Sequence, residues 1–253
     1  MKHPSGSDSL LVIIPAFNEE GAIAGVVRSV LRHVPYAPVL VIDDCSTDGT
    51  RAAARAAGAE LLCLPHHLGL GGAVQAGYKL AFELGFDYVI RVDGDGQHNA
   101  ADIPRIFEAL KTSGCEMIIG SRFVEGSGSS SSFARTLGIR FFRAVLRPIL
   151  GKRVHDPTSG FVGVNRRALQ VFSRSFPLEY PEIEALVVLQ RRRFRFEEVP
   201  VKMLPRLTGR STITARVSLY YIAHVLLGVF VNILKYDRRF RRGKSAPGPG
   251  AGD

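Results

Sequence analysis

Cysteine is scarce in this 253-residue chain, and tryptophan is absent. The three cysteines, Cys45, Cys63 and Cys115, lie far apart and form no CxxC pair. This distribution excludes a disulfide framework and favours small buried thiols in a reducing compartment. The first ten residues, MKHPSGSDSL, lack the basic start and the apolar stretch of a secretory signal. We therefore expect a cytoplasmic protein, or one that faces the cytoplasm.

Long apolar runs are also rare. The run from Val217 to Leu234 has 18 residues without a formal charge, which is the lower edge of a membrane span. On a helical wheel its polar residues gather on one side, whereas a lipid-spanning helix is more often apolar all round. The pattern predicts that residues 215–236 form an amphipathic, membrane-associated helix. A single membrane span is the alternative.

Acidic residues are few at the C-terminal end. The chain has 33 Lys and Arg against 23 Asp and Glu, and the excess of ten lies wholly in residues 191–253, which hold 14 basic and 4 acidic residues. A nucleic-acid-binding protein is more often basic throughout, so we expect no nucleic-acid partner. A polybasic segment such as KYDRRFRRGK (235–244) favours an anionic membrane surface. The tail, 237–253, is expected to be disordered, as is the N-terminus, 1–9.

A second basic segment, 134–153, contains six Lys and Arg residues and no acid. Arg140, Arg143 and Arg147 share one face of a predicted helix, and apolar side chains cover the other face. This pattern is typical of an interfacial helix that lies on anionic lipid. The alternative is an ordinary surface helix packed on the sheet.

Residues 10–121 alternate short apolar runs with helical patterns. The expected strands are 10–17, 38–46, 59–64, 87–96 and 115–121, followed by 161–164 and 195–203. Strands that alternate with helices predict βαβ units and therefore an α/β fold with a mostly parallel, Rossmann-like sheet flanked by helices. We expect one domain over residues 10–214. Ligands bind such sheets beyond the carboxyl ends of the strands.

Two acidic clusters follow predicted strands. Asp93, Asp95 and Gln97 are spaced two apart, so an extended backbone points their oxygen ligands the same way. Such ligands suit a hard divalent ion, and a polar turn is the alternative. Asp43 and Asp44 end another strand, where a carboxylate can bind a ribose diol or a base N–H. Capping of the next helix is the alternative there, and both roles can hold at once.

Six motifs together resemble a known family. They are PAFNEE (15–20), VIDDCSTDGT (41–50), RVDGDGQH (91–98), GSRF (120–123), DPTSGF (156–161) and EVPVKMLPRLTGRSTI (198–213). Their order and spacing resemble inverting family 2 glycosyltransferases, in particular the group of dolichyl-phosphate mannose synthase and bacterial polyprenyl-phosphate glycosyltransferases. The resemblance implies a GT-A fold, a UDP- or GDP-linked sugar donor, and Mg²⁺ or Mn²⁺ as cofactor.

The resemblance also implies roles on the donor side of the site. Positions around the nucleotide base and ribose are matched by Pro15, Phe17, Glu19 and Asp44. Asp93 matches the first aspartate of its motif, near the ribose and sugar. Asp95 and Gln97 match the ligands of the metal ion that holds the diphosphate.

On the acceptor side, positions near the phosphates are matched by Arg122, Arg206 and Ser211. Asp156 sits where the family has a carboxylate close to the sugar, so the implied catalytic residues are Asp93, Asp156 and Arg122. The sequence departs from the family at Thr212, where many relatives have a lysine. Arg210 is the candidate to replace that lysine.

These features predict transfer of a sugar to a polyprenyl phosphate (dolichyl or undecaprenyl) by an enzyme held peripherally or monotopically on the inner face of the membrane. A lipid phosphate is already an anion and needs no strong base. The first alternative is a hydroxyl acceptor on a saccharide or protein in cell-envelope polysaccharide synthesis, which needs a base such as Asp156 or Glu184. The second alternative is a non-catalytic nucleotide- or membrane-binding regulator.

Overall fold

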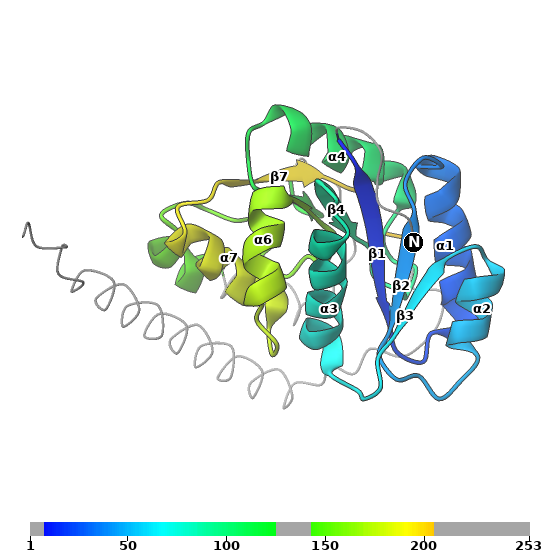
Figure 1. The fold of residues 1–253 in the computed structure, drawn as a ribbon. Helices are drawn as coiled ribbons and strands as arrows, with labels where there is room; N and C mark the ends of the chain where they lie inside the picture. The colour runs from blue at the N-terminus through cyan, green and yellow to red at the C-terminus, as the bar shows by residue number, and fades with distance from the viewer. Residues whose placement is uncertain (1–7, 125–142, 205–253) are drawn as a thin grey trace, which may run out of the picture.

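The computed structural model describes residues 8–124 and 143–204. Within this part, seven strands form one sheet in the order β3-β2-β1-β4-β6-β5-β7, between two layers of helices (Figure 1). The strands are β1 (Leu10–Ala16), β2 (Val39–Asp43), β3 (Glu60–Cys63), β4 (Tyr88–Arg91), β5 (Met117–Ser121), β6 (Val162–Asn165) and β7 (Phe196–Pro200). Neighbouring strands are parallel except for β6, which is antiparallel to β4 and β5. The predicted mostly parallel α/β sheet is confirmed.

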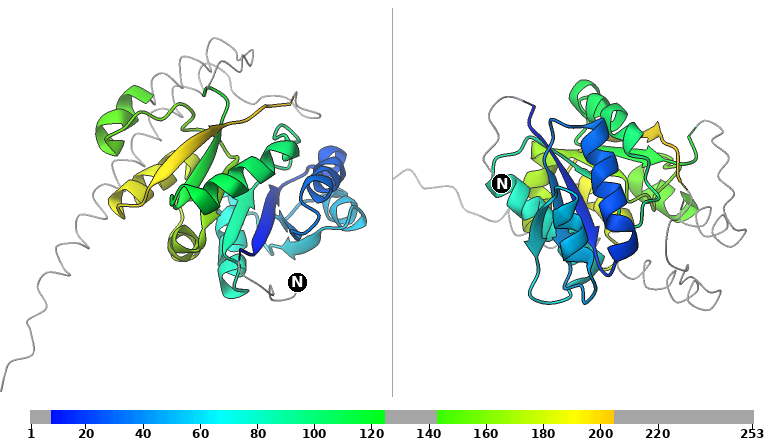
Figure 2. Two further views of the ribbon diagram at one scale, coloured as in Figure 1. Left: turned by 90° about the horizontal axis from the view of Figure 1, so that it is seen from above. Right: turned by 90° about the vertical axis from the view of Figure 1, so that its right-hand side faces the viewer.

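The helices divide between the two faces of the sheet (Figures 1 and 2). One face is covered by α1 (Glu20–His33), α2 (Thr50–Ala56) and α4 (Ile103–Thr112), which follows the short 3₁₀ helix η1 (Ala100–Asp102). The other face is covered by α3 (Gly69–Glu83), α6 (Arg166–Arg174) and α7 (Pro181–Arg191). In α1 the buried residues recur at helical spacing, so one stripe faces the sheet and the rest stays polar.

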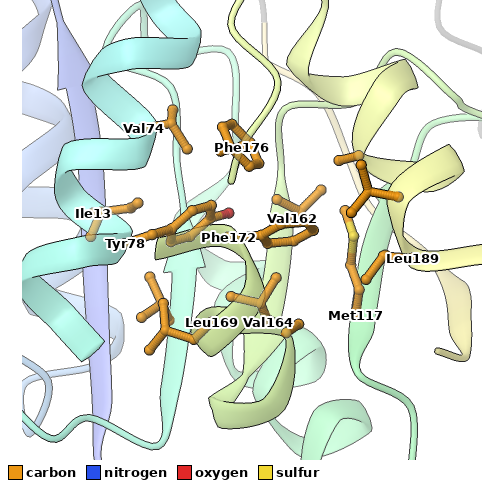
Figure 3. Close-up of a cluster of buried hydrophobic side chains, with 14 of the residues drawn as sticks. Ile13, Val74, Tyr78, Met117, Val162, Val164, Leu169, Phe172, Phe176 and Leu189 are labelled. Carbon is orange, nitrogen blue, oxygen red and sulfur yellow. The ribbon is translucent and has the colours of Figure 1, made fainter. Parts of the chain in front are cut away.

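Aromatic side chains fill the core between the sheet and the α3–α6 layer (Figure 3). The rings of Tyr78, Phe172 and Phe176 meet pairwise, with centroids 5.1–5.7 Å apart. Aliphatic residues from both layers, Ile13 and Val164 among them, surround these rings. Burial of this apolar surface is the main stabilising contribution to the packing of α3 and α6 on the sheet.

The polar motifs of the sequence meet at one edge of the sheet. The parallel strands β1, β2, β3 and β4 all end there, and so do β5 and β7, because both are antiparallel to β6. The antiparallel β6 begins there, so the DPTSG segment (156–160) before it lies at the same edge. We call this edge of the sheet the carboxyl edge.

Two segments with predicted roles at the membrane and at the N-terminus are described in part. Residues 143–150 are helical, but Leu146 and Leu150 are only 1% and 2% exposed and belong to the protein core. Arg143 donates to the carbonyl oxygen of His155. This part of the predicted interfacial helix is thus packed on the protein, as in the alternative, because its apolar side chains complete the core. Ser9, expected in a flexible N-terminus, instead donates two hydrogen bonds to Asp87.

Other membrane predictions concern residues that the structure does not describe. Arg140 and the first part of the basic segment lie outside the described residues, as do the predicted helix 215–236 and the tail 237–253. Among residues 8–124 and 143–204, no helix has the length and apolar character needed to cross a membrane.

Candidate functional site

The loops after β1 and β2 are held together by reciprocal hydrogen bonds at the starts of two helices. The N–H of Glu19 donates to the Thr50 hydroxyl (2.8 Å), and that of Glu20 to Asp48 Oδ2 (3.2 Å). In return, the N–H of Gly49 donates to Glu20 Oε2 (3.1 Å). Asp48 Oδ1 also accepts the N–H of Thr50 (3.0 Å), so Asp48 helps to satisfy the first turns of both α1 and α2. The capping role considered for this loop is therefore real.

Asp44 lies just beyond β2, close to the aromatic rings of Phe17 and His67. Its buried carboxylate accepts the N–H of Leu68 (2.7 Å) and lies 2.9 Å from His67 Nδ1. The exposed ring of Phe17 packs on His67, with centroids 4.1 Å apart. A flat apolar surface beside a buried carboxylate suits a nucleoside base. The structure thus brings the predicted residues Phe17 and Asp44 to one place.

The loop after β4 packs directly against the loop after β1. A Cβ added at Gly94 would lie 3.2 Å from the carbonyl oxygen of Pro15 and 3.5 Å from Glu19 Cγ. Glycine at this position lets the two loops approach closely. Pro15 and Glu19, predicted for the nucleotide, and the DGDG segment therefore lie side by side at the carboxyl edge.

Asp93 is held by Arg91, a residue to which the sequence motifs gave no role. Arg91 is 2% exposed at the end of β4, and its guanidinium donates to Asp93 Oδ1 (3.0 and 3.1 Å) and to Glu182 Oε1 (2.8 Å). His98 accepts the N–H of Asp93 at Nδ1 (3.0 Å). Burial alone would raise the pKa of Asp93, but the charge and hydrogen bonds of Arg91 outweigh it and lower that pKa. Asp93 is thus a fixed anion.

The predicted metal ligands lie in the turn that follows. Asp95 is half-buried, and its Oδ1 accepts the N–H of Gln97 (3.0 Å). The carbonyl oxygen of Gln97 accepts the N–H of Leu204 (2.8 Å). The strand-like segment after β7 therefore runs along this turn. Leu204, the last described residue, lies beside it. Arg206, Arg210 and Ser211 lie outside the described residues.

Arg122 and Asp156 form a closed ion pair. Asp156 is fully buried, and its two carboxylate oxygens accept hydrogen bonds from Arg122 Nε and Nη2, both at 2.6 Å. Glu198 then accepts the N–H groups of His155 and Asp156, each at 2.7 Å. These contacts tie the start of the DPTSG segment to the end of β5 and to β7. The Arg122–Asp156 pair therefore anchors the segment that leads into β6, and we call this pair the structural clamp.

The two candidate bases, Asp156 and Glu184, are both buried in this structure. A general base must reach the proton that it removes, so it needs an accessible oxygen. Asp156 is turned inward to Arg122, and Glu184 is buried in α7. Neither carboxylate is exposed to solvent. The guanidinium of Arg122, expected near the phosphates, is likewise directed at Asp156.

Gly160 packs closely against the Arg91–Asp93 pair. A Cβ at this position would lie 2.5 Å from Asp93 Oδ2 and 2.7 Å from Arg91 Nη2. We expect Gly160→Ala to displace Asp93, to cost about 1–3 kcal/mol of stability through overpacking, and to lower turnover about tenfold or more through misplacement of the site. Kinetics and urea unfolding measure both effects.

The matched control is Gly25→Ala in α1, where a Cβ would meet no atom within 4 Å. That exchange should leave turnover unchanged and stabilise the helix slightly. Wild-type turnover in Gly160→Ala would contradict the importance of this close contact.

Comparison with known proteins identifies the family. The model for "Glycosyl transferase family 2" matches residues 11–172, which is more than half of the chain. The chain belongs to glycosyltransferase family 2. This family 2 glycosyltransferase is 30% identical over 215 residues to undecaprenyl-phosphate mannosyltransferase of Micrococcus luteus, covering 80% of this chain and 86% of that protein. It is 29% identical over 223 residues to UDP-N-acetylglucosamine–dolichyl-phosphate N-acetylglucosaminyltransferase of Methanococcus voltae, covering 78% and 87%.

Solved structures give the same fold for the family 2 domain. Glucosyl-3-phosphoglycerate synthase from Mycobacterium tuberculosis, in complex with phosphoglyceric acid, matches with a TM-score of 0.67 and 24% identity, covering 91% of this chain and 80% of that one. A structure of the same enzyme with Mn²⁺, uridine-diphosphate-glucose and phosphoglyceric acid matches with a TM-score of 0.66 and 25% identity, covering 88% and 80%. The expected GT-A fold and the glycosyltransferase assignment are confirmed, which leaves no support for a non-catalytic regulator.

Proposed function

We propose that this glycosyltransferase moves a sugar from a UDP- or GDP-linked donor to a polyprenyl phosphate, with inversion at the anomeric carbon, on the cytoplasmic face of a membrane. The observation that carries the proposal is the meeting of Phe17, Asp44, Asp93 and Asp95 at the carboxyl edge. This edge offers an aromatic surface and a buried carboxylate for a nucleoside, beside oxygen ligands for a diphosphate-bound ion. Relatives named as undecaprenyl-phosphate and dolichyl-phosphate transferases support the lipid acceptor.

The residues at this edge fit Mg²⁺ or Mn²⁺. Asp95 and Gln97 supply hard oxygen donors, which these ions prefer. No group of three or more His, Cys, Asp or Glu side chains suited to a metal occurs in the described part of the chain. That is consistent with Mg²⁺, which is usually held by one or two carboxylates together with substrate phosphates. When bound, the ion would neutralise the charge that builds on the leaving diphosphate.

The protein's own groups prepare the donor for departure. Arg91 keeps Asp93 ionised and in one orientation, so that Asp93 can face the positive charge that develops on the sugar. Asp44 and Phe17 bind the nucleoside, and the close packing of Gly94 on Pro15 holds the loop with Asp93 and Asp95 against the loop with Phe17. Fixed dipoles and charges stabilise a transition state without reorganising during the reaction.

The burial of the candidate bases supports a phosphate acceptor over a hydroxyl acceptor. A hydroxyl acceptor must lose a proton, and the two carboxylates considered for that step, Asp156 and Glu184, are buried. A phosphate acceptor is already ionised near neutral pH and needs no such group. Arg206, Arg210 and Ser211 follow Leu204 in the sequence, and Leu204 lies beside Gln97. We propose that these three residues bind the acceptor phosphate.

A donor panel tests the proposal. The purified full-length protein is incubated with radiolabelled UDP- and GDP-sugars, Mg²⁺ or Mn²⁺, and detergent-dispersed undecaprenyl or dolichyl phosphate. We expect label to enter the lipid phase with one donor and EDTA to abolish the transfer. Label that enters only added saccharide or protein would favour the hydroxyl-acceptor alternative and contradict the proposal.

A further inference from the structure

The exposed apolar side chains of this protein are concentrated around the carboxyl edge. In residues 8–124 and 143–204, six large hydrophobic side chains are exposed. Five of them surround the site, namely Phe17, Leu68, Leu70, Leu178 and Leu204, with exposed fractions between 43% and 55%. We call these five residues the apolar rim. The sixth, Tyr36, follows α1 at the opposite edge of the sheet.

Separate segments build the apolar rim, and the site connects them. Leu68 follows His67, on which Phe17 packs, and its N–H binds Asp44. A Cβ at Gly71 would lie 2.5 Å from Leu178 Cα, so the first turn of α3 touches the connection between α6 and α7 (Figure 1). Leu204 lies across the site, bound through its N–H to Gln97. The rim therefore borders both Asp44, proposed for the nucleoside, and the turn with Asp95 and Gln97, proposed for the metal ion.

From this arrangement we infer that the four leucines of the apolar rim dock on a lipid bilayer and turn the mouth of the site toward the acceptor, whereas Phe17 faces the donor. Exposed apolar groups that gather at one place mark an interaction surface. Four of the five rim residues are leucines, which suit acyl chains, whereas the strongest contacts between proteins are enriched in Trp, Tyr and Arg. The inference rests on the proposed function, because a polyprenyl phosphate is embedded in a membrane.

Charge in the rest of the chain favours the same occupant. The 49 residues after Leu204 hold nine Lys and Arg residues against two Asp residues. They begin where the described chain ends, beside Gln97 and within the apolar rim. Basic segments are attracted to anionic leaflets, and apolar insertion adds to that attraction. An anionic bilayer therefore matches both the rim and the segment that starts from it.

The absence of tryptophan allows a direct test with the full-length chain. Leu70→Trp and Leu178→Trp place single reporters on the rim, and Tyr36→Trp places a matched reporter at the other edge. Each protein is mixed with phosphatidylcholine–phosphatidylglycerol vesicles, with or without brominated acyl chains. We expect a blue shift and quenching by the brominated lipid at positions 70 and 178, and neither at position 36. This readout needs no donor, metal or acceptor, so it is independent of whether the proposed reaction occurs.

Each other result would overturn the inference. No quenching at positions 70 and 178 in vesicle-bound protein would mean that other segments hold the membrane. Equal quenching at position 36 would mean that the rim contacts the bilayer no more than the opposite edge of the sheet does. A blue shift without vesicles would show that the rim has another occupant. That occupant is a second copy of the chain if the shift depends on protein concentration, and a segment of the same chain if it does not.

A second pair of variants links the rim to turnover. Leu70→Ser/Leu178→Ser should lower binding to vesicles about tenfold, because two apolar side chains lose their insertion energy. It should raise KM for vesicle-embedded acceptor and leave kcat for a water-soluble, short-chain acceptor unchanged. Tyr36→Ser should change none of these quantities. Unchanged vesicle binding in the double variant would contradict the docking surface.

Discussion

Asp95→Asn is expected to lower turnover by roughly 10² or more while the protein stays folded, because it removes a charge from the proposed ion that stabilises the leaving diphosphate. The fold should survive because Asp95 lies in a half-buried turn, where its Oδ1 accepts the N–H of Gln97. An asparagine Oδ1 can accept the same bond. Steady-state kinetics with Mg²⁺ and Mn²⁺, together with metal titration by calorimetry, measure the effect.

The matched control for this exchange is Glu108→Gln, which removes one negative charge from the exposed face of α4. Glu108 pairs only with Lys111 three residues later among the ion pairs of the described residues, 2.9 Å away. Exposed pairs of this kind contribute little to stability, so neither turnover nor metal affinity should change. Wild-type turnover in Asp95→Asn, or full activity in EDTA, would contradict the metal assignment.

Arg122→Met is expected to destabilise the protein by about 3–5 kcal/mol, because it leaves the buried Asp156 carboxylate without its partner. Both oxygens of Asp156 are engaged by Arg122, and neither residue is exposed. Urea unfolding followed by circular dichroism measures the loss. Turnover should fall as well, since the DPTSG segment that carries Gly160 is anchored by this pair.

The double variant Arg122→Met/Asp156→Leu separates the buried charge from the other effects of the exchange. Replacing a buried ion pair with apolar groups is often neutral or stabilising, so this variant should regain most of the lost stability. A fully stable but inactive Arg122→Met protein would instead favour the role near the phosphates that the sequence motif implies. It would contradict the structural clamp.

The central strands β1, β2 and β5 could be predicted from the sequence because they are buried on both faces and read as short apolar runs. β1, for example, was expected at 10–17 and lies at Leu10–Ala16. The reversed direction of β6 could not be predicted, since one strand carries no signal of its orientation. Its direction depends on the connection from β5, which crosses residues that the structure does not describe.

The site could be predicted only in part, because some of its residues are buried in contacts with residues far away in the sequence. The motifs place Asp44, Asp93 and Asp95 at strand ends, and parallel strands then bring them together. The role of Asp156 could not be predicted, because its partner Arg122 comes from 34 residues away and only their contact reveals the closed pair.

Arg91 and Glu182 were missed for the same reason. Their ion pair spans 91 residues, and no local pattern marks it. The one signal in the sequence was a charged residue within an otherwise apolar strand, between Ile90 and Val92. A buried charge of that kind requires a partner.

The central claim is that the acceptor is a lipid phosphate rather than a hydroxyl. Its most direct test offers the purified full-length enzyme undecaprenyl phosphate and undecaprenol in parallel, with the active donor and Mg²⁺ or Mn²⁺, and detects products by mass spectrometry. We expect a glycosylated lipid phosphate from the first acceptor and no product from the second, with Asp95→Asn as the inactive control. Equal transfer to undecaprenol, or no transfer to the phosphate by enzyme that glycosylates a saccharide, would contradict it.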